Sequence, residues 1–240
     1  MSVTGSFYSL ALGSRKVEIE LAEEVFAPTT TTTMLIRHMG DVTGRKVLDL
    51  GCGSGVIGVA AAILGAAKVV AVDVMQEAVA LARRNVERNG VADRVDVRHS
   101  DLFATLGDEK FDLIVDDVSG IAEPVARVSS WYPPSIPSGG PDGTGPTNRM
   151  LEQAAQHLAP GGSLIFPVIS LAAANRILDT ARQVFGDGLK LLESRMIPFC
   201  PQLYPHVELL TALRERGVID FEQRNSRLLW RLEIYSGTFA

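Results

Sequence analysis

Short apolar runs alternate with amphipathic stretches along this chain of 240 residues. Apolar runs of roughly four to eight residues between turn residues are typical of buried strands, and apolar residues three or four apart are typical of helices. The predicted strands are 47–50, 69–72, 94–99, 111–115, 163–168, 189–197 and 228–235. The predicted helices are 56–64, 75–89, 146–158, 171–185 and 207–216. This alternation predicts an α/β fold with a parallel, doubly wound sheet through the first five strands.

The first 40 residues follow a different pattern. Residues 7–12 and 17–21 predict a hairpin, and five consecutive threonines, 29–33, precede a predicted helix over 34–39. The threonine hydroxyls either cap this helix or close over a ligand, and their position just before the glycine-rich unit favours the second role. We therefore expect a hairpin and gating segment, 1–40, with Thr33 as a ligand contact, and a main domain, 41–240.

A glycine-rich unit organises the main domain. The strand 47–50 runs into Gly51, Gly53 and Gly55, which allow a sharp turn and a close approach to a ligand. A helix follows, and the next strand delivers Asp73 to its carboxyl end, where an acid accepts hydrogen bonds from ribose hydroxyls. The unit predicts a nucleotide-binding site.

Asp49 distinguishes between two kinds of nucleotide ligand. The spacing of Gly53, Gly55 and Gly58 also fits the dinucleotide fingerprint, with Asp73 at the expected distance. However, the carboxylate of Asp49, two residues before the first glycine, would repel a pyrophosphate. A ligand with an ammonium and a sulfonium group would be attracted instead. The predicted cofactor is therefore S-adenosyl-L-methionine.

The remaining candidate residues follow the carboxyl ends of strands, where open parallel sheets bind ligands. Asp101 is expected to accept a hydrogen bond from the adenine amino group, and Asp49 with the glycine loop is expected to hold the methionine portion. The predicted cofactor contacts are Thr33, Asp49, Gly51, Cys52, Gly53, Gly55, Asp73, Val74, Asp101, Leu102 and Asp116. Asp116 and Asp117, after the fourth strand, are also the predicted catalytic pair, one of which orients the methyl acceptor or takes its proton.

Two long segments are predicted to line the acceptor pocket. Residues 121–145 are rich in proline and glycine and are expected to form an irregular loop, which at this length is usually functional. Its Trp131 and Tyr132 either contact the acceptor or pack beneath the loop. In the second segment, 198–227, His206 is either a general base or a structural residue.

The composition limits the class of protein. The net charge of −5 argues against a general nucleic-acid binder, and two cysteines, Cys52 and Cys200, give no disulfide framework. The start lacks the features of a signal peptide, no apolar run is long enough to span a membrane, and no metal-ligand spacing is present. We expect a cytoplasmic protein without a metal.

The sequence resembles the class I S-adenosylmethionine-dependent methyltransferases in Val-Leu-Asp-Leu-Gly-Cys-Gly-Ser-Gly (47–55). This resemblance implies a Rossmann-like sheet of seven strands, mostly parallel, with an antiparallel last strand. Within the class, the chain is similar to the release-factor glutamine methyltransferase and small methyltransferase domain family. The similar segments are Val-Phe-Ala-Pro-Thr (25–29), Phe-Asp-Leu-Ile-Val (111–115), Gly-Gly-Pro-Asp-Gly (139–143) and Leu-Ala-Pro-Gly-Gly (158–162).

The chain departs from that family in two respects. The family's Asn-Pro-Pro-Tyr is replaced by Asp-Val-Ser-Gly (117–120), and an ionised Asp accepts hydrogen bonds but donates none. Only about 40 residues precede the first strand of the sheet, so the family's long N-terminal domain is not expected. Both departures favour a small-molecule acceptor with an N or O nucleophile, methylated by in-line displacement.

Three alternatives stay open. They are a protein (glutamine-type) or RNA methyltransferase, a catalytically inactive binding subunit with this fold, and a nucleotide-dependent oxidoreductase, which Asp49 disfavours. Neither a membrane nor a nucleic acid is an expected partner, and a homodimer is left open.

Overall fold

The computed structural model describes residues 6–239, which form two compact units. The first unit comprises residues 6–117, 156–165 and 239, and the second comprises 118–155 and 166–238. Strand β7 (Leu158–Ile169) contributes its first part to the first unit and its second part to the second. The glycine-rich unit and all the predicted cofactor contacts lie in the first unit.

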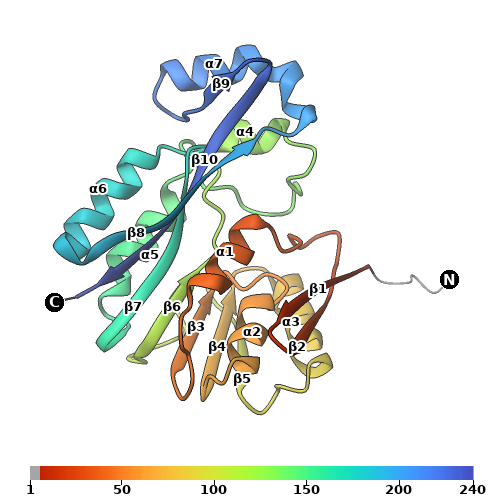
Figure 1. Ribbon diagram of the computed structural model, residues 1–240, viewed down its shortest axis with the longest axis vertical. Helices are drawn as coiled ribbons and strands as arrows, with labels where there is room; N and C mark the ends of the chain where they lie inside the picture. The colour runs from red at the N-terminus through yellow and green to blue at the C-terminus, as the bar shows by residue number, and fades with distance from the viewer. Residues whose placement is uncertain (1–5, 240) are drawn as a thin grey trace. The chain divides into compact units, whose positions relative to one another are not determined.

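The first unit is built on parallel strands. Strands β3 (Lys46–Leu50), β4 (Lys68–Asp73), β5 (Val95–His99) and β6 (Phe111–Asp116) join the start of β7 in the order β5-β4-β3-β6-β7 (Figure 1). Their registers align Leu50 with Asp116 and Leu50 with Val72. The residues that follow β3, β4 and β6 are therefore brought together at one edge of the sheet.

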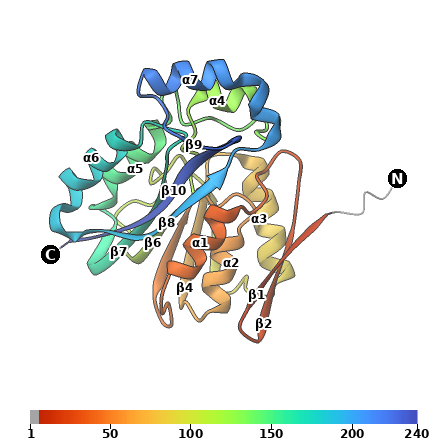
Figure 2. The same cartoon turned by 45° about the horizontal axis from the view of Figure 1, so that its top comes forward.

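Helices α2 (Val56–Ile63) and α3 (Gln76–Arg88) pack against these strands, and α1 (Thr30–His38) packs against α2 (Figures 1 and 2). All eight residues of α2 are buried because they are small or aliphatic. The hairpin β1 (Phe7–Leu12) and β2 (Arg15–Glu20) packs against α2 and α3. The buried Asn85 joins these parts, since its amide bonds both the backbone of Glu20 and the carbonyl of Ser54.

The second unit contains the antiparallel strands. Strand β10 (Arg227–Thr238) runs antiparallel to β8 (Leu189–Pro198) and to the short β9 (Glu222–Arg224). In the strand order, β10 lies between β7 and β8. The helices of the second unit are α4 (Glu123–Val128), α5 (Gly145–Ala154), α6 (Ala174–Phe185) and α7 (Val207–Glu215), with 3-10 turns at Gly186–Gly188 and Pro201–His206.

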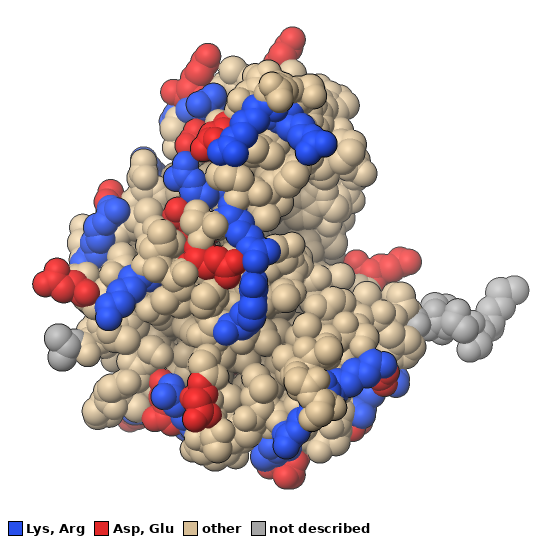
Figure 3. All heavy atoms as spheres, viewed as in Figure 1, with Lys and Arg blue, Asp and Glu red and all other residues tan. Residues whose placement is uncertain are grey.

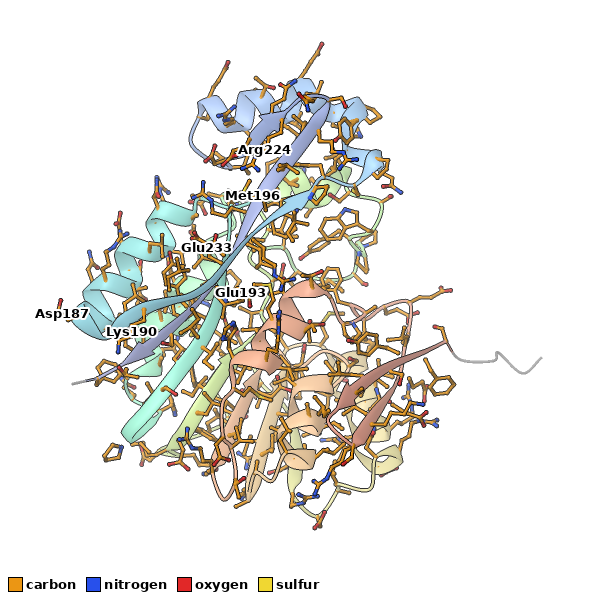
Figure 4. All side chains as sticks on the ribbon, viewed as in Figure 1. Asp187, Lys190, Glu193, Met196, Arg224 and Glu233 are labelled. Carbon is orange, nitrogen blue, oxygen red and sulfur yellow. The ribbon has the colours of Figure 1, made fainter. Side chains whose placement is uncertain are left out.

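Strand β8 ends the strand order, so one of its backbone edges is not paired within the described sheet. Lys190, Glu193 and Met196 lie along it, and Glu233 lies on the neighbouring β10 (Figure 4). Arg195 also lies on β8, where its Nε is 2.6 Å from Glu193 Oε1. Charged side chains on a terminal strand disfavour its pairing with other chains.

A cluster of glycines explains the compactness of 139–145. Gly143 has a φ of +81°, and a Cβ built on it would lie 2.5 Å from the Cβ of Ala172 and 2.8 Å from the nitrogen of Ala122. A Cβ on Gly139 would lie 2.7 Å from Gly143. Only glycine fits at these two positions, so the Gly-Gly-Pro-Asp-Gly segment has a packing role within the second unit.

The predicted fold class is confirmed, including the mostly parallel sheet and the antiparallel last strand. Four boundaries were wrong. Residues 121–145 contain α4, whose Pro124 lies at a position that tolerates proline. Helix α5 ends at Ala154 rather than 158, β7 begins at Leu158 and includes Pro160, and α1 begins within the threonine run. The short β9 is an element that the sequence pattern did not predict.

None of the described helices is long and apolar enough to cross a membrane. Acidic and basic side chains are interspersed on the face shown in Figure 3.

Candidate active site

The glycine loop after β3 has a rigid backbone. Gly51, Gly53 and Gly55 have φ values of +73°, +50° and +81°, in the left-handed region that glycine adopts without strain. The nitrogens of Gly51 and Cys52 both donate to the carbonyl of Val72, each at 2.9 Å. The loop is therefore attached to the end of β4. The thiol of Cys52 is buried, which raises its pKa well above the ordinary value, so it stays protonated.

Asp49 is completely buried beneath this loop. Its Oδ2 accepts a hydrogen bond of 2.8 Å from the backbone nitrogen of Gly58 in the first turn of α2. A Cβ on Gly58 would lie 3.1 Å from that oxygen, so glycine allows the close approach. The pKa of Asp49 is raised to about 8, chiefly by burial. The Gly58 bond opposes this rise, and the charges of Asp117 and Asp73 add to it.

Two properties of Asp49 indicate the kind of ligand. Its carboxyl group already occupies the anion-binding position at the N-terminus of α2, where a pyrophosphate would otherwise be held. Its Oδ1 is buried and has no hydrogen-bond partner within the part of the chain that the structure describes. A buried carboxylate oxygen without a partner is costly unless a donor or cation meets it. The site therefore fits a cationic ligand, as S-adenosylmethionine is.

Asp73 connects the glycine loop to α3. Its Oδ2 accepts from the nitrogen of Gly53 and its Oδ1 from the nitrogen of Met75, each at 2.9 Å. Burial raises its pKa, while these backbone bonds act in the opposite direction. Each carboxylate oxygen has a second lone pair, so the predicted bonds to ribose hydroxyls remain available. Val74 follows with 49% of its surface exposed, an apolar side chain beside the predicted adenine position.

The turn after β5 holds a residue in an unusual conformation. Leu102 is buried and has a φ of +49°, which is uncommon for a residue other than glycine. The hydroxyl of Ser100 donates to the carbonyl of Leu102 at 2.9 Å and accepts from the nitrogen of Thr105. The neighbouring Asp101 is exposed. These bonds fix the turn that carries the predicted adenine contacts.

The two carboxylates after β6 have different environments. Asp116 is the last residue of β6 and is completely buried, whereas Asp117 directly follows the strand and is partly exposed. Asp117 Oδ2 accepts a hydrogen bond of 2.8 Å from the hydroxyl of Thr32. Burial raises the pKa of Asp117 to about 7, and the Thr32 bond lowers it. Asp117 is thus the better placed of the two to meet an acceptor.

The threonine run has the capping role, and its closing over a ligand stays a prediction. Thr29 caps α1, since its hydroxyl accepts from the nitrogens of Thr31 and Thr32. Thr32 contacts the site through Asp117, whereas the hydroxyl of Thr33 donates to the carbonyl of Thr29 at 3.0 Å. The cofactor contact of Thr33 stays a prediction. Thr32 was missed because nothing in five identical residues distinguishes one of them.

The predicted acceptor-binding residues lie in the second unit. Tyr132 is buried. Its hydroxyl lies 2.5 Å from Ser119 Oγ and donates a hydrogen bond of 2.8 Å to the carbonyl of Pro137. Tyr132 therefore packs beneath its loop, while Trp131 is 41% exposed. His206 precedes α7 and is partly buried. Contacts of these residues with an acceptor stay predictions.

Comparisons with known proteins agree with this geometry. The family model for ribosomal protein L11 methyltransferase (PrmA) matches residues 27–138, a stretch that includes all the carboxylates described above. The chain is 38% identical over 154 residues to the ribosomal protein uL3 glutamine methyltransferase of Bradyrhizobium diazoefficiens, covering 61% of this chain and 47% of that protein. It is 31% identical over 166 residues to the release factor glutamine methyltransferase of Gloeobacter violaceus, covering 65% and 58%.

Residues 27–138 are therefore PrmA-like, and the chain has the fold of class I methyltransferases. It spans about half the length of the curated relatives that it matches. Among solved structures, the 16S rRNA N2 G1207 methyltransferase of T. thermophilus, in complex with AdoMet and guanosine, has a TM-score of 0.59 and 16% identity. That match covers 98% of this chain and 50% of the other and shows the shared fold.

These relatives correct one prediction. A small-molecule methyl acceptor was expected from Asp117 and from the short N-terminal segment. The methyltransferase domain instead matches two proteins that are named for the methylation of a ribosomal protein and of a release factor. The small-molecule prediction is therefore wrong. The replacement of Asn by Asp changes what the site can hydrogen-bond, which is not by itself a measure of the acceptor's size.

Proposed function

We propose that this chain is an S-adenosylmethionine-dependent methyltransferase whose acceptor is a nitrogen atom of a protein. The observation that carries the proposal is the identity of 38% to a glutamine methyltransferase of ribosomal protein uL3. The family match over 27–138 supports it, because that stretch holds Asp49, Asp73 and Asp117. The partnerless Oδ1 of Asp49 supports a cationic cofactor.

Each part of the first unit has a separate task in this proposal. Asp49 and the glycine loop hold the methionine portion, Asp73 holds the ribose, and Val74, Asp101 and Leu102 surround the adenine. When bound, S-adenosylmethionine supplies a methyl group on a positively charged sulfur. The buried residues of the loop exclude water from the methyl group. Exclusion of water favours transfer of the methyl group to an aligned nucleophile.

Asp117 meets the acceptor nitrogen. The carboxylate accepts a hydrogen bond from an N–H group and so aims the nitrogen lone pair at the methyl carbon. A nitrogen–carbon bond forms while the methyl–sulfur bond breaks and its electron pair stays on sulfur. The methylated nitrogen then carries one extra proton, and this proton moves to Asp117. Because the pKa of Asp117 is raised to about 7, this carboxylate is a much better proton acceptor than an exposed one.

The same residue points to a second candidate acceptor. An amide nitrogen of glutamine donates to Asp117 through N–H, but the side chain cannot hold the amide carbonyl, as an Asn could. A protonated amine, from a lysine side chain or a chain terminus, has donors only and a complementary charge. The amine first gives one proton to Asp117, which frees the lone pair that attacks the methyl carbon. The position of the methyl group distinguishes the two acceptors.

The test uses the purified chain, labelled S-adenosylmethionine, and purified ribosomal proteins uL3 and L11 and a release factor. We expect label in one of these proteins and a methyl group located by peptide mass spectrometry on a glutamine or an amine. Asp117→Asn is the matched variant and should reduce transfer by about a hundredfold or more, as loss of a general base does. Cofactor binding without transfer to any translation protein would overturn the acceptor assignment, and no cofactor binding would overturn the whole proposal.

A further inference from the structure

The hydroxyl of Thr32 lies between the cap of α1 and Asp117. Its oxygen accepts from the backbone nitrogen of Thr29 at 3.1 Å, and its hydrogen points to Asp117 Oδ2 at 2.8 Å. Thr32 is buried, with 5% of its surface exposed, at the third position of α1. The hydroxyl of Thr29 is itself engaged by the nitrogens of Thr31 and Thr32. The hydroxyls of Thr29 and Thr32 lie 3.5 Å apart, so the 2.8 Å contact with Asp117 is the shorter of the two that the hydrogen of Thr32 could make.

We propose that Thr32 is a positioning residue, whose hydroxyl holds one oxygen of Asp117 so that the other is presented to the acceptor nitrogen. This inference rests on the proposed function. A carboxylate that has lost rotational freedom about its last bond presents its free oxygen in one place, which aligns the acceptor before reaction. The backbone reinforces the arrangement, since the nitrogen of Asp117 donates to the carbonyl of Leu50 at 3.0 Å.

The bond from Thr32 also favours the charged form of Asp117. Burial acts against that form, and the hydroxyl partly offsets it by donating to the carboxylate. His99, at the end of β5, is a basic group that acts on Asp73. The other ionisable groups of this cluster are acids: Asp49 from β3, Asp73 from β4, Asp116 from β6 and the thiol of Cys52 in the glycine loop. Thr32, from α1, is the uncharged donor that opposes them at Asp117. Its loss should therefore raise the pKa of Asp117.

Thr32→Val tests the proposal because it keeps the side-chain shape and removes the hydroxyl. With the protein acceptor, we expect the acid limb of the pH–kcat profile to move to higher pH. Turnover on that limb should fall about tenfold, the factor for one pKa unit, with S-adenosylmethionine affinity unchanged. Thr32→Ser should restore the profile. Thr31→Val, the same change at a neighbouring threonine outside the site, should leave it unaltered.

A second measurement needs no acceptor. Titration of the Asp117 carboxyl carbon by NMR in the cofactor-free chain should show a higher pKa in Thr32→Val than in the unmodified chain and in Thr32→Ser. A double-mutant cycle with Asp117→Asn separates this effect from a loss of stability, since Thr32→Val should then cause no further loss of turnover. An unshifted carboxyl titration, or an equal loss in the Asp117→Asn background, would overturn the role of Thr32. If no protein acceptor is found but the titration shifts, the proposed function fails and the pairing of Thr32 with Asp117 stands.

Discussion

At the scale of single residues, the site depends on carboxyl groups that burial keeps partly protonated. The pKa of Asp49 is raised to about 8, chiefly because the side chain is entirely enclosed. Among the described residues, a hydrogen-bond partner is found for Oδ2 and not for Oδ1. A cationic cofactor placed next to Oδ1 would favour the charged form. Binding should then be coupled to the release of a proton from Asp49.

This coupling gives the first prediction. At pH 7, binding of S-adenosylmethionine should release roughly one proton from Asp49, and affinity should increase as the pH rises toward 8. Calorimetric titration in buffers of different ionisation enthalpy measures the number of protons released. Asp49→Asn should abolish the release and weaken binding by about tenfold or more, because a charged hydrogen bond is lost.

Asp117→Asn is the control for that experiment, because Asp117 belongs to the same cluster but is assigned to the acceptor. It should retain the proton release on cofactor binding. If the release disappears in Asp117→Asn and persists in Asp49→Asn, the two carboxylates have been assigned the wrong partners.

At the scale of elements, the second unit depends on the glycines of 139–145. Gly143→Ala should destabilise the chain by about 3 kcal/mol or more, because its Cβ would overlap the Cβ of Ala172 and the residue has a positive φ. Gly140 is the matched control, with a similar φ of +86° and no atom within 4 Å of a built Cβ. Gly140→Ala should cost only about 1 kcal/mol, the backbone term alone. Urea unfolding of both variants measures the difference, and equal destabilisation would show that packing at Gly143 is unimportant.

Most elements follow from local patterns, and the exceptions have physical reasons. Strands such as β3 and β4 could be predicted because both faces are buried and their residues are continuously apolar. Helix α4 could not, because it is six residues long and lies within a proline-rich segment, with Pro124 as its second residue. Residues 159–162 were left between the predicted helix 146–158 and strand 163–168, but their Pro-Gly-Gly lies within β7, where the register with β6 shifts. A local pattern does not predict such an irregular strand segment.

The candidate site shows the same limit. The positions of Asp49 and Asp73 could be predicted from nearby sequence. Asp49 lies in the strand just before the glycine loop, and Asp73 ends the next strand along the chain. The bond between Thr32 and Asp117 joins residues 85 positions apart, and only the folded sheet brings them together. The difference between Asp116 and Asp117 likewise depends on the fold, since Asp116 is the last residue of β6 and Asp117 directly follows the strand.

At the scale of the whole molecule, the buried acids determine how stability depends on pH. Asp49 and Asp117 hold protons in the folded chain that the unfolded chain releases above its ordinary carboxyl pKa, 3.8. Their contribution to the free energy of unfolding is therefore largest below that value. It falls as the pH rises, and the fall ends near pH 8.

Glu109 acts in the opposite direction at low pH. Ion pairs with Lys46 at 2.7 Å and Arg98 at 2.6 Å lower the pKa of Glu109 to about 2. Its contribution to the free energy of unfolding is therefore present above its ordinary pKa, 4.5, and is lost as the pH falls through 2. We expect maximal stability of the cofactor-free chain in mildly acid solution, measured by urea midpoints from pH 2 to 9. The double variant Asp49→Asn, Asp117→Asn should flatten the decline between pH 5 and 8, and an unchanged decline would mean that other groups cause it.

The buried amide of Asn85 has a consequence for how the first unit responds to its ligand. One side chain bonds both the last residue of β2 and Ser54 in the glycine loop, so neither partner can rearrange without changing the environment of the other. Such sharing is a coupling free energy, and a coupling free energy is reciprocal. A ligand that orders the loop stabilises the packing of the hairpin. A partner that binds the hairpin increases the affinity of the loop for its ligand, by the same factor by which the ligand increases the affinity for the partner.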